Sequence, residues 1–223
     1  MTPRELLGSA IVPGGGELRL FRRGLDYMIV LDRNELMSSR MSGSEEALAV
    51  MTCERLGECT SPHLLIGGYG MGFTLRSALA ALGAAARVTV AELVPEVIDW
   101  ARGPMQELAA GCLADPRVEL VFGDVAELIE RSPATYDAIL LDVDNGPDGL
   151  TRDANDRLYS PRGLRAAKAA LMPGGILAVW SAAPDRGFAK ALAEAGFAVD
   201  EVPVRARSNG KGARHIIWFA AKR

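Results

Sequence analysis

The feature that most constrains this 223-residue chain is an alternation of short apolar runs with longer helical segments, which begins at residue 63. The runs end in glycines or acidic residues, and the segments between them carry apolar residues at helical spacing. The runs cover 63–68, 87–92, 117–124, 136–144 and 176–181, and the helical segments cover 73–84, 95–110, 125–131, 161–172 and 185–197. Repeated β-α units with apolar strands predict an α/β, Rossmann-like fold, in which helices cover both faces of a mainly parallel sheet.

Both ends of the chain carry hairpin patterns. Residues 17–32 form two extended runs with turn residues at 23–26, which predicts a small N-terminal β-hairpin. Near the C-terminus, 198–207 and 213–222 flank the sequence SNGKG, which predicts an antiparallel hairpin.

A helix is predicted between the N-terminal hairpin and the first apolar run. Ser42 or Ser44 is a suitable N-cap, acidic residues follow in the first turn, and Gly57 is a suitable end. The composition shifts near residue 60, so we predict an N-terminal hairpin plus helix in 1–60 and an α/β domain in 61–223.

A glycine-rich loop follows the first apolar run and precedes a helix. Its glycines are Gly67, Gly68, Gly70 and Gly72. Glycines at this place allow a sharp turn and a close approach of ligand to backbone. Glu92 ends the next strand about 20 residues further on, where a carboxylate accepts both hydroxyls of a ribose. The pattern predicts a nucleoside site; the alternative is a tight turn with a solvated Glu92.

The spacing of the loop and the end of the third strand refine this prediction. The loop has the pattern G-x-G-x-G rather than the G-x-G-x-x-G of dinucleotide sites, which favours a mononucleoside such as S-adenosylmethionine over NAD. Asp124 ends the third strand and could accept a hydrogen bond from the adenine amino group. It is also a good N-cap for the next helix, and the two roles are compatible.

Acidic residues end the fourth strand. Asp142 and Asp144 point to one face because side chains alternate along a strand. An acid after four apolar residues needs a partner, and a cationic amine or a sulfonium ligand provides one. Asp142 would then take a proton from an attacking amine. The alternative is a structural aspartate that accepts from nearby backbone N–H groups.

Two further segments contain candidate substrate contacts. The polar loop after the fourth strand is long enough to serve as a binding loop. Its candidates are Asp148, Asn155, Asp156 and Tyr159, for each of which simple solvation is the alternative. Trp180, near the end of the fifth strand, is expected to line the pocket.

Composition excludes several classes of protein. A hydrophobic fraction of 49% excludes a disordered chain, and a net charge of −3 argues against nucleic-acid binding. The sequence has neither a signal-peptide pattern nor a run of 18 apolar residues, so we expect no membrane association. Three cysteines without a C-x-x-C pair suit a reducing cytoplasm. Cys53, Cys59 and His63 match no zinc spacing, so no metal is predicted.

Five segments together are similar to a known family. They read LLIGGYGMGFTLRSAL, VAELVPEVIDWAR, VFGDVAELI, YDAILLDVDNGP and LMPGGILAVW, in this order. With these segments the chain resembles the spermidine synthase-like branch of class I S-adenosylmethionine (SAM)-dependent methyltransferase-fold proteins. The resemblance extends over about residues 17–221. The resemblance implies a class I methyltransferase-type, seven-stranded sheet with an antiparallel last strand, and a homodimer.

The resemblance also implies roles for individual residues. The positions implied to bind the nucleoside are Gly67, Gly68, Gly70, Gly72, Glu92, Leu93, Asp124 and Val125. Asp142 matches the aspartate proposed to deprotonate the amine in the family. The positions implied to contact the substrate are Glu45, Glu46, Asp144, Tyr159 and Trp180.

The chain departs from spermidine synthases at four places. Its glycine loop lacks their internal aspartate, and residues 43–46 (Gly-Ser-Glu-Glu) replace their Tyr-His-Glu stretch. Asn145 stands where their D-S-S-D-P motif has its second acid, and Trp180-Ser181 takes the place of their glutamine after the fifth strand. These departures affect the putrescine pocket and leave the nucleoside pocket intact.

Three functions follow from this pattern. The first is a transferase that alkylates an amine-type small molecule, with decarboxylated SAM or SAM as the sulfonium donor. The alternative is a SAM-dependent methyltransferase of unknown acceptor. The absence of an acidic residue from the glycine loop slightly favours this alternative. The second alternative is a non-catalytic nucleoside-binding protein, because fold alone does not determine function.

Overall fold

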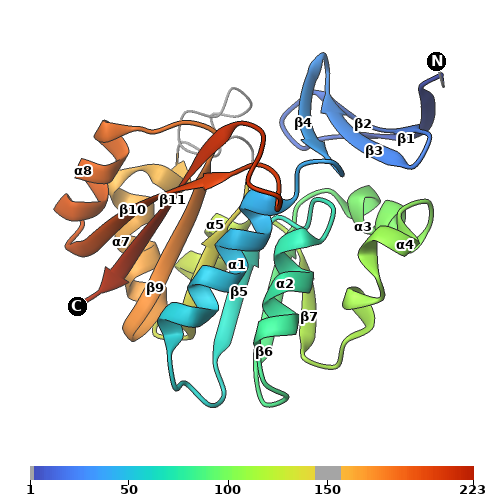
Figure 1. Cartoon of the computed structure of the whole chain (residues 1–223). Helices are drawn as coiled ribbons and strands as arrows, with labels where there is room; N and C mark the ends of the chain where they lie inside the picture. The colour runs from blue at the N-terminus through green and yellow to red at the C-terminus, as the bar shows by residue number, and fades with distance from the viewer. Residues whose placement is uncertain (1–2, 144–156) are drawn as a thin grey trace.

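The computed structural model describes residues 3–143 and 157–223, and Figure 1 shows two sheets in this part of the chain. A four-stranded antiparallel sheet is formed near the N-terminus, and a seven-stranded sheet forms the centre of the molecule. In Figure 1 the small sheet lies beside the upper ends of strands of the large one. Residues 144–156 lie between the two described ranges and include Asp144, Asp148, Asn155 and Asp156, so these predictions lie outside the described residues.

The N-terminal sheet is a meander with the order β1-β2-β3-β4. Its strands are β1 (Glu5–Ile11), β2 (Glu17–Arg23), β3 (Asp26–Leu31) and β4 (Asn34–Ser38). The predicted hairpin is confirmed as β2–β3, with Arg23 paired with Asp26 across the turn. The two outer strands were not predicted. β1 carries Gly8 and Ser9 in its centre and β4 is short, so neither shows a clear alternating pattern.

The large sheet has the order β10-β11-β9-β8-β5-β6-β7. Its strands are β5 (His63–Gly67), β6 (Arg87–Glu92), β7 (Val118–Phe122), β8 (Tyr136–Leu141), β9 (Leu171–Ser181), β10 (Phe197–Arg205) and β11 (Arg214–Lys222). β5 to β9 pair in parallel, and β11 is antiparallel to both β9 and β10. The predicted parallel sheet with an antiparallel C-terminal hairpin is therefore confirmed. The strand order reverses between β5 and β8, and open α/β sheets bind ligands at such a switch point.

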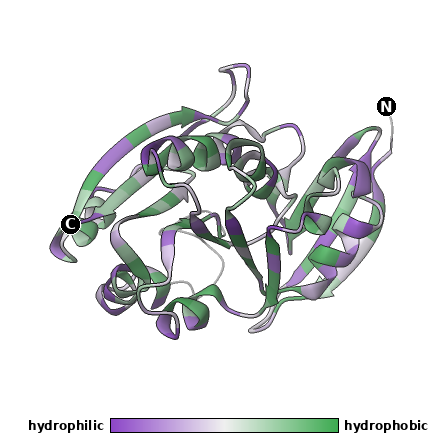
Figure 2. Ribbon diagram, turned by 90° about the horizontal axis from the view of Figure 1, so that it is seen from below, coloured by the Kyte–Doolittle hydropathy of each residue, from purple (hydrophilic) through white to green (hydrophobic). Residues whose placement is uncertain are grey.

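Helices cover both faces of the large sheet, as predicted. The helices are α1 (Gly43–Leu56), α2 (Phe73–Ala81), α3 (Pro95–Arg102), α4 (Gln106–Ala109), α5 (Val125–Glu130), α7 (Pro161–Ala170) and α8 (Arg186–Glu194), and a 3-10 turn covers Cys112–Ala114. α1, α2 and α3 pack with Leu64 and Ile66 on one face, whereas α5, α7 and α8 pack with Leu65 on the other. Successive residues of β5 thus enter opposite cores, which is why the strand is apolar throughout. Figure 2 shows this hydrophobic centre between helices of mixed polarity.

Several element boundaries differ from the prediction, most clearly at two places. The segment predicted as one helix over 95–110 is divided into α3 and α4, because Gly103 and Pro104 interrupt it. β9 begins at Leu171, where the preceding helix was still predicted, and its residues 172–174 are exposed. Ser42 occupies the N-cap position of α1 as expected, but its side chain makes no capping hydrogen bond.

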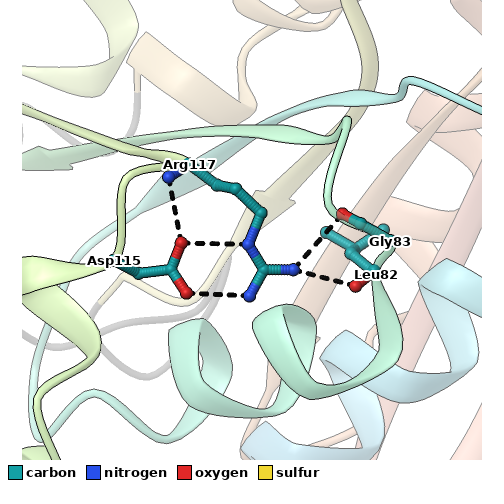
Figure 3. Close-up of polar contacts among 4 residues, drawn as sticks. All are labelled: Leu82, Gly83, Asp115 and Arg117. Atoms are coloured by element: carbon teal, nitrogen blue, oxygen red, sulfur yellow. Dashed lines mark hydrogen bonds and ion pairs between the residues drawn. The ribbon is translucent and has the colours of Figure 1, made fainter.

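The turn before β7 is tied to the end of α2 by one arginine (Figure 3). The Arg117 guanidinium donates to both carboxylate oxygens of Asp115, at 2.9 and 2.8 Å. Its third nitrogen donates to the carbonyls of Leu82 and Gly83, at 2.8 and 3.3 Å. The bidentate pair holds the planar group in one orientation, and the group links the turn before β7 to the end of α2.

The N-terminal sheet contributes to the same core as α1, α2 and α3. Gly8 of β1 lies against Trp100 of α3, so that a Cβ on it would lie 2.5 Å from the indole nitrogen. The Tyr27 hydroxyl donates to the carbonyl of Pro104 at 2.6 Å. The division into domains at residue 60 stays a prediction. Within the described ranges, no helix is both long and apolar enough to cross a membrane.

Candidate functional site

A cavity of about 180 Å³ lies where the carboxyl ends of the parallel strands meet the N-terminal sheet. Its floor comes from the segments that follow four neighbouring strands and from α1, and the described residues there are Glu45, Gly68, Gly70, Ala91, Glu92, Leu93, Val94, Val97, Gly123, Asp124, Val125, Asp142, Val143 and Trp180. Its wall is apolar and comes from the N-terminal sheet and its turns, with Val12, Leu18, Ile29, Leu31, Leu36 and Met37. The cavity therefore combines polar strand ends with an apolar cover.

The glycine loop makes the turn from β5 to α2 at the edge of the cavity. Gly68 has a φ of +83°, and a Cβ there would lie 2.7 Å from the carbonyl oxygen of Asp142. Gly70 has a φ of +55°, and a Cβ there would lie 2.9 Å from the terminal methyl of Met37 in the N-terminal sheet. Only glycine combines this backbone conformation with so close an approach. Gly67 and Gly72 belong to the same turn but do not line the cavity, so the loop exposes backbone at Gly68 and Gly70.

Glu92 is held at the end of β6 by the backbone on either side of it. One carboxylate oxygen accepts from the Tyr69 N–H at 2.9 Å, and the other accepts from the Val94 N–H at 2.8 Å. Burial raises the pKa of this carboxyl, while these backbone donors oppose the shift. Each oxygen has a further lone pair, so the group can still accept ribose hydroxyls.

Asp124 caps α5, which was the alternative considered for it. Its Oδ1 accepts from the Ala126 N–H at 2.8 Å, and its Oδ2 lies 3.5 Å from the Arg157 guanidinium. Asp124 also lines the cavity, next to Val125. The capping role is therefore shown, and contact with adenine stays a prediction.

Asp142 follows β8 directly and lies beside the glycine loop. Its Oδ2 accepts from the Thr74 hydroxyl at 2.8 Å, and its N–H donates to the Gly67 carbonyl at 3.2 Å. Removal from water raises the pKa of the carboxyl, and the Thr74 hydrogen bond opposes this shift. A carboxyl whose pKa is raised towards neutrality is a suitable proton acceptor for an amine.

Glu45, in the first turn of α1, is the second acidic group at this end of the cavity. Its side chain is 7% exposed, and one carboxylate oxygen accepts from the Ser44 hydroxyl at 2.6 Å. Burial raises its pKa, and the negative charge of Asp142 raises it further. The two carboxyls thus disfavour each other's ionisation, and a bound cation would relieve both.

The charges of the cavity have one sign. Among its described lining residues, four are acidic and none is lysine, arginine or histidine. Such a cavity suits a ligand that carries positive charge and lacks a carboxylate. Within the described ranges, no group of three or more metal-binding side chains gathers.

The structure brings some of the predicted site residues together and places others elsewhere. Glu46 does not line the cavity, although it follows Glu45. Tyr159 packs edge-on against Phe188, with ring centroids 5.5 Å apart, in the core on the opposite face of the sheet. Trp180 lines the cavity as expected. Thr74 and the apolar wall were not predicted, because these residues form no motif and come together only through packing.

The chain is similar in sequence to known proteins. Residues 50–185 match the family model "Spermine/spermidine synthase domain". The chain is 36% identical over 171 residues to a polyamine aminopropyltransferase of Mycobacterium tuberculosis. The aligned region covers 75% of this chain and 31% of that protein. The chain is 32% identical over 127 residues to polyamine aminopropyltransferase 2 of Hyperthermus butylicus, covering 57% and 40%. It is also 36% identical over 125 residues to putrescine N-methyltransferase 3 of Nicotiana tabacum, covering 55% and 31%.

Solved structures show the same fold. A spermidine synthase in complex with the transition-state analogue AdoDATO superposes with a TM-score of 0.78 at 20% identity, covering 98% of this chain and 73% of that one. The spermidine synthase of Thermotoga maritima gives a TM-score of 0.77 at 20% identity, with the same coverage. The chain spans well under half the length of the curated relatives named above. Because the family model matches more than half of the chain, this protein belongs to the spermine/spermidine synthase domain family.

Proposed function

We propose that the protein transfers an aminopropyl group from decarboxylated SAM to a small-molecule amine. The observation that carries the proposal is the pair of carboxyls, Glu45 and Asp142, in a cavity whose described lining has no cationic side chain. SAM itself carries a carboxylate, for which the described lining residues offer no cationic partner. The decarboxylated donor and a protonated amine both bring positive charge that the acids can stabilise.

Within this proposal each residue has a distinct task. Glu92 accepts hydrogen bonds from the ribose, Asp124 accepts one from adenine, and Leu93 and Val125 contact the base. Asp142 takes the proton of the attacking amine, held in place by Thr74. The sulfonium, when bound, supplies an activated carbon, so the protein contributes mainly orientation and proton removal.

Methyl transfer from SAM is the second candidate function. Two observations favour it: the glycine loop contains no acidic residue, and putrescine N-methyltransferase 3 of Nicotiana tabacum is 36% identical to this chain over 125 residues. The products distinguish the reactions. Aminopropyl transfer leaves methylthioadenosine, whereas methyl transfer leaves S-adenosylhomocysteine.

The test supplies each donor separately with a panel of amines and identifies the nucleoside product by mass spectrometry. Calorimetry with the two donors measures their affinities in parallel. Methylthioadenosine from decarboxylated SAM supports the proposal. S-Adenosylhomocysteine as the only product supports the methyltransferase, and donor binding without either product supports the non-catalytic alternative.

The remaining expectations concern the setting of the protein. We infer a homodimer in the cytoplasm that binds neither membranes nor nucleic acid, from the family resemblance, the cysteine pattern and the net charge of −3. Light scattering coupled to size-exclusion chromatography measures the oligomeric state.

A further inference from the structure

A chain of hydrogen-bonding side chains leads away from the cavity at Glu45. The Glu45 carboxylate accepts from the Ser44 hydroxyl at 2.6 Å, and the Ser44 oxygen lies 2.9 Å from Nδ1 of His215. Ser44 is fully buried, whereas His215 is only partly buried, at the start of β11. The three side chains therefore connect a buried acid to a histidine that reaches the surface.

Backbone packing brings these side chains together. The Gly43 N–H donates to the carbonyl of Ala206 at 3.0 Å, which ties the start of α1 to the turn between β10 and β11. A Cβ on Gly43 would lie 2.3 Å from backbone atoms of Arg207 and Ser208. Figure 1 shows this turn, in red, beside the start of α1. Only a glycine permits so close a contact, and the contact aligns Ser44 with His215.

The surroundings of His215 orient its ring and lower its pKa. Trp180 packs edge-on against it with centroids 4.8 Å apart, Val204 of β10 is its strand neighbour, and Ser44 faces it from α1. Burial lowers the pKa of the imidazole, and no charged neighbour contributes to that shift. A neutral imidazole is able to accept a proton.

The geometry points to Ser44 and His215 as the path by which a proton leaves Glu45 for solvent during amine alkylation. This inference rests on the proposed function. The amine lone pair forms the new N–C bond, and the electrons of the breaking C–S bond go to sulfur, which becomes a neutral thioether. Asp142 takes the N–H proton, which then passes to Glu45 in the lining of the same cavity.

Transfer along the path then needs only short steps. At rest the Ser44 hydroxyl donates to Glu45, so Nδ1–H of His215 donates to the Ser44 oxygen and Nε2 carries no proton. Exchange with water moves the ring proton from Nδ1 to Nε2, after which protonated Glu45 donates to the Ser44 oxygen while the Ser44 hydroxyl donates to Nδ1. The imidazolium that results loses its Nε2 proton to water, which restores the Nδ1–H ring and leaves Glu45 ionised. Ser44 and His215 act through Glu45, so they are positioning residues rather than groups that touch the substrate.

The experiment has one arm that does not depend on activity. The chain contains only two histidines, His63 and His215, so nitrogen-15 NMR of labelled histidine resolves both. We expect S44A and E45Q each to change the tautomer ratio and pKa of His215. His63 lies at the opposite end of the strands and serves as an internal control. A His215 titration that is the same in E45Q as in the native protein would overturn the proposed path.

The second arm measures turnover with decarboxylated SAM and the best amine. H215N keeps a hydrogen-bonding group at the position of Nδ1 but cannot carry the proton. We expect kcat to fall by about 10- to 100-fold, with KM and Tm nearly unchanged, and added imidazole to restore part of the rate. Native kcat in H215N, or a loss that imidazole does not restore and that parallels a lower Tm, would refute the role. A native protein inactive with every donor would instead refute the proposed function, while the NMR arm would still decide whether the three side chains are coupled.

Discussion

Replacing Gly68 by alanine tests whether the loop geometry governs both stability and the site. The residue has a φ of +83°, and the added Cβ would lie 2.7 Å from the Asp142 carbonyl oxygen. That oxygen belongs to backbone, since the Asp142 N–H is bonded to the Gly67 carbonyl, so it cannot move as a flexible side chain would. The left-handed conformation costs about 1–2 kcal/mol, and the overpacking about 1–3 kcal/mol.

Together these terms predict that G68A is destabilised by about 3 kcal/mol and that its Tm falls by about 6–12 °C. Displacement of Asp142 should also lower kcat. Circular dichroism during heating measures the first effect, and initial rates measure the second. The matched control is G83A, because a Cβ on Gly83 would meet no atom within 4 Å and the residue has no positive φ. Its stability should change by less than about 0.5 kcal/mol. If G68A and G83A melt together, the steric reasoning is wrong.

The remaining predictions concern single side chains. D142N should bind the donor normally but lose about 100-fold or more in kcat; unchanged turnover would remove Asp142 from the mechanism. E92A should weaken donor binding, measured by calorimetry, and equal affinity would contradict the ribose contact. Because the folded-state pKa of Glu45 is raised, its contribution to stability is lost as pH rises above about 4.5. E45Q should therefore melt above the native protein at pH 8, with less advantage at pH 5. R117K loses the bidentate contact with Asp115 and should lower Tm by a few degrees; an unchanged Tm would make this contact dispensable.

Much of the central fold was predictable because its signals are local. The parallel strands of the large sheet are mainly apolar, and glycine, proline or an acid marks their ends, so β5 to β9 could be located. The division of the segment after β6 at Gly103 also follows a local rule, the interruption of a helix by glycine and proline, although one continuous helix was predicted there. The edge strands β1 and β4 could not be located in the same way, since pairing with β2 and β3 stabilises them more than their own composition does.

The side of the candidate site that we propose to bind the nucleoside follows from the order of residues along the chain. Glu92 ends β6, Gly68 follows β5 directly and Asp124 lies two residues after β7, and the ends of neighbouring parallel strands meet at one edge of a sheet. Asp142 is placed by the same rule. The side proposed to bind the acceptor amine cannot be predicted in this way, because the orientation of α1 decides which of its side chains face the cavity. Of the two adjacent acids on α1, only Glu45 faces the cavity.

By itself, the sequence determined the layered α/β architecture, the glycine turn and the row of acids at the strand ends. These features depend on the two-residue period of strands and on turn chemistry, which act over a few residues. Tertiary structure decided which apolar residues cover the cavity, that Tyr159 packs in the other core, and that Ser44 meets His215. The last two are separated by 171 residues, and only the packing of α1 against the C-terminal hairpin brings them into contact.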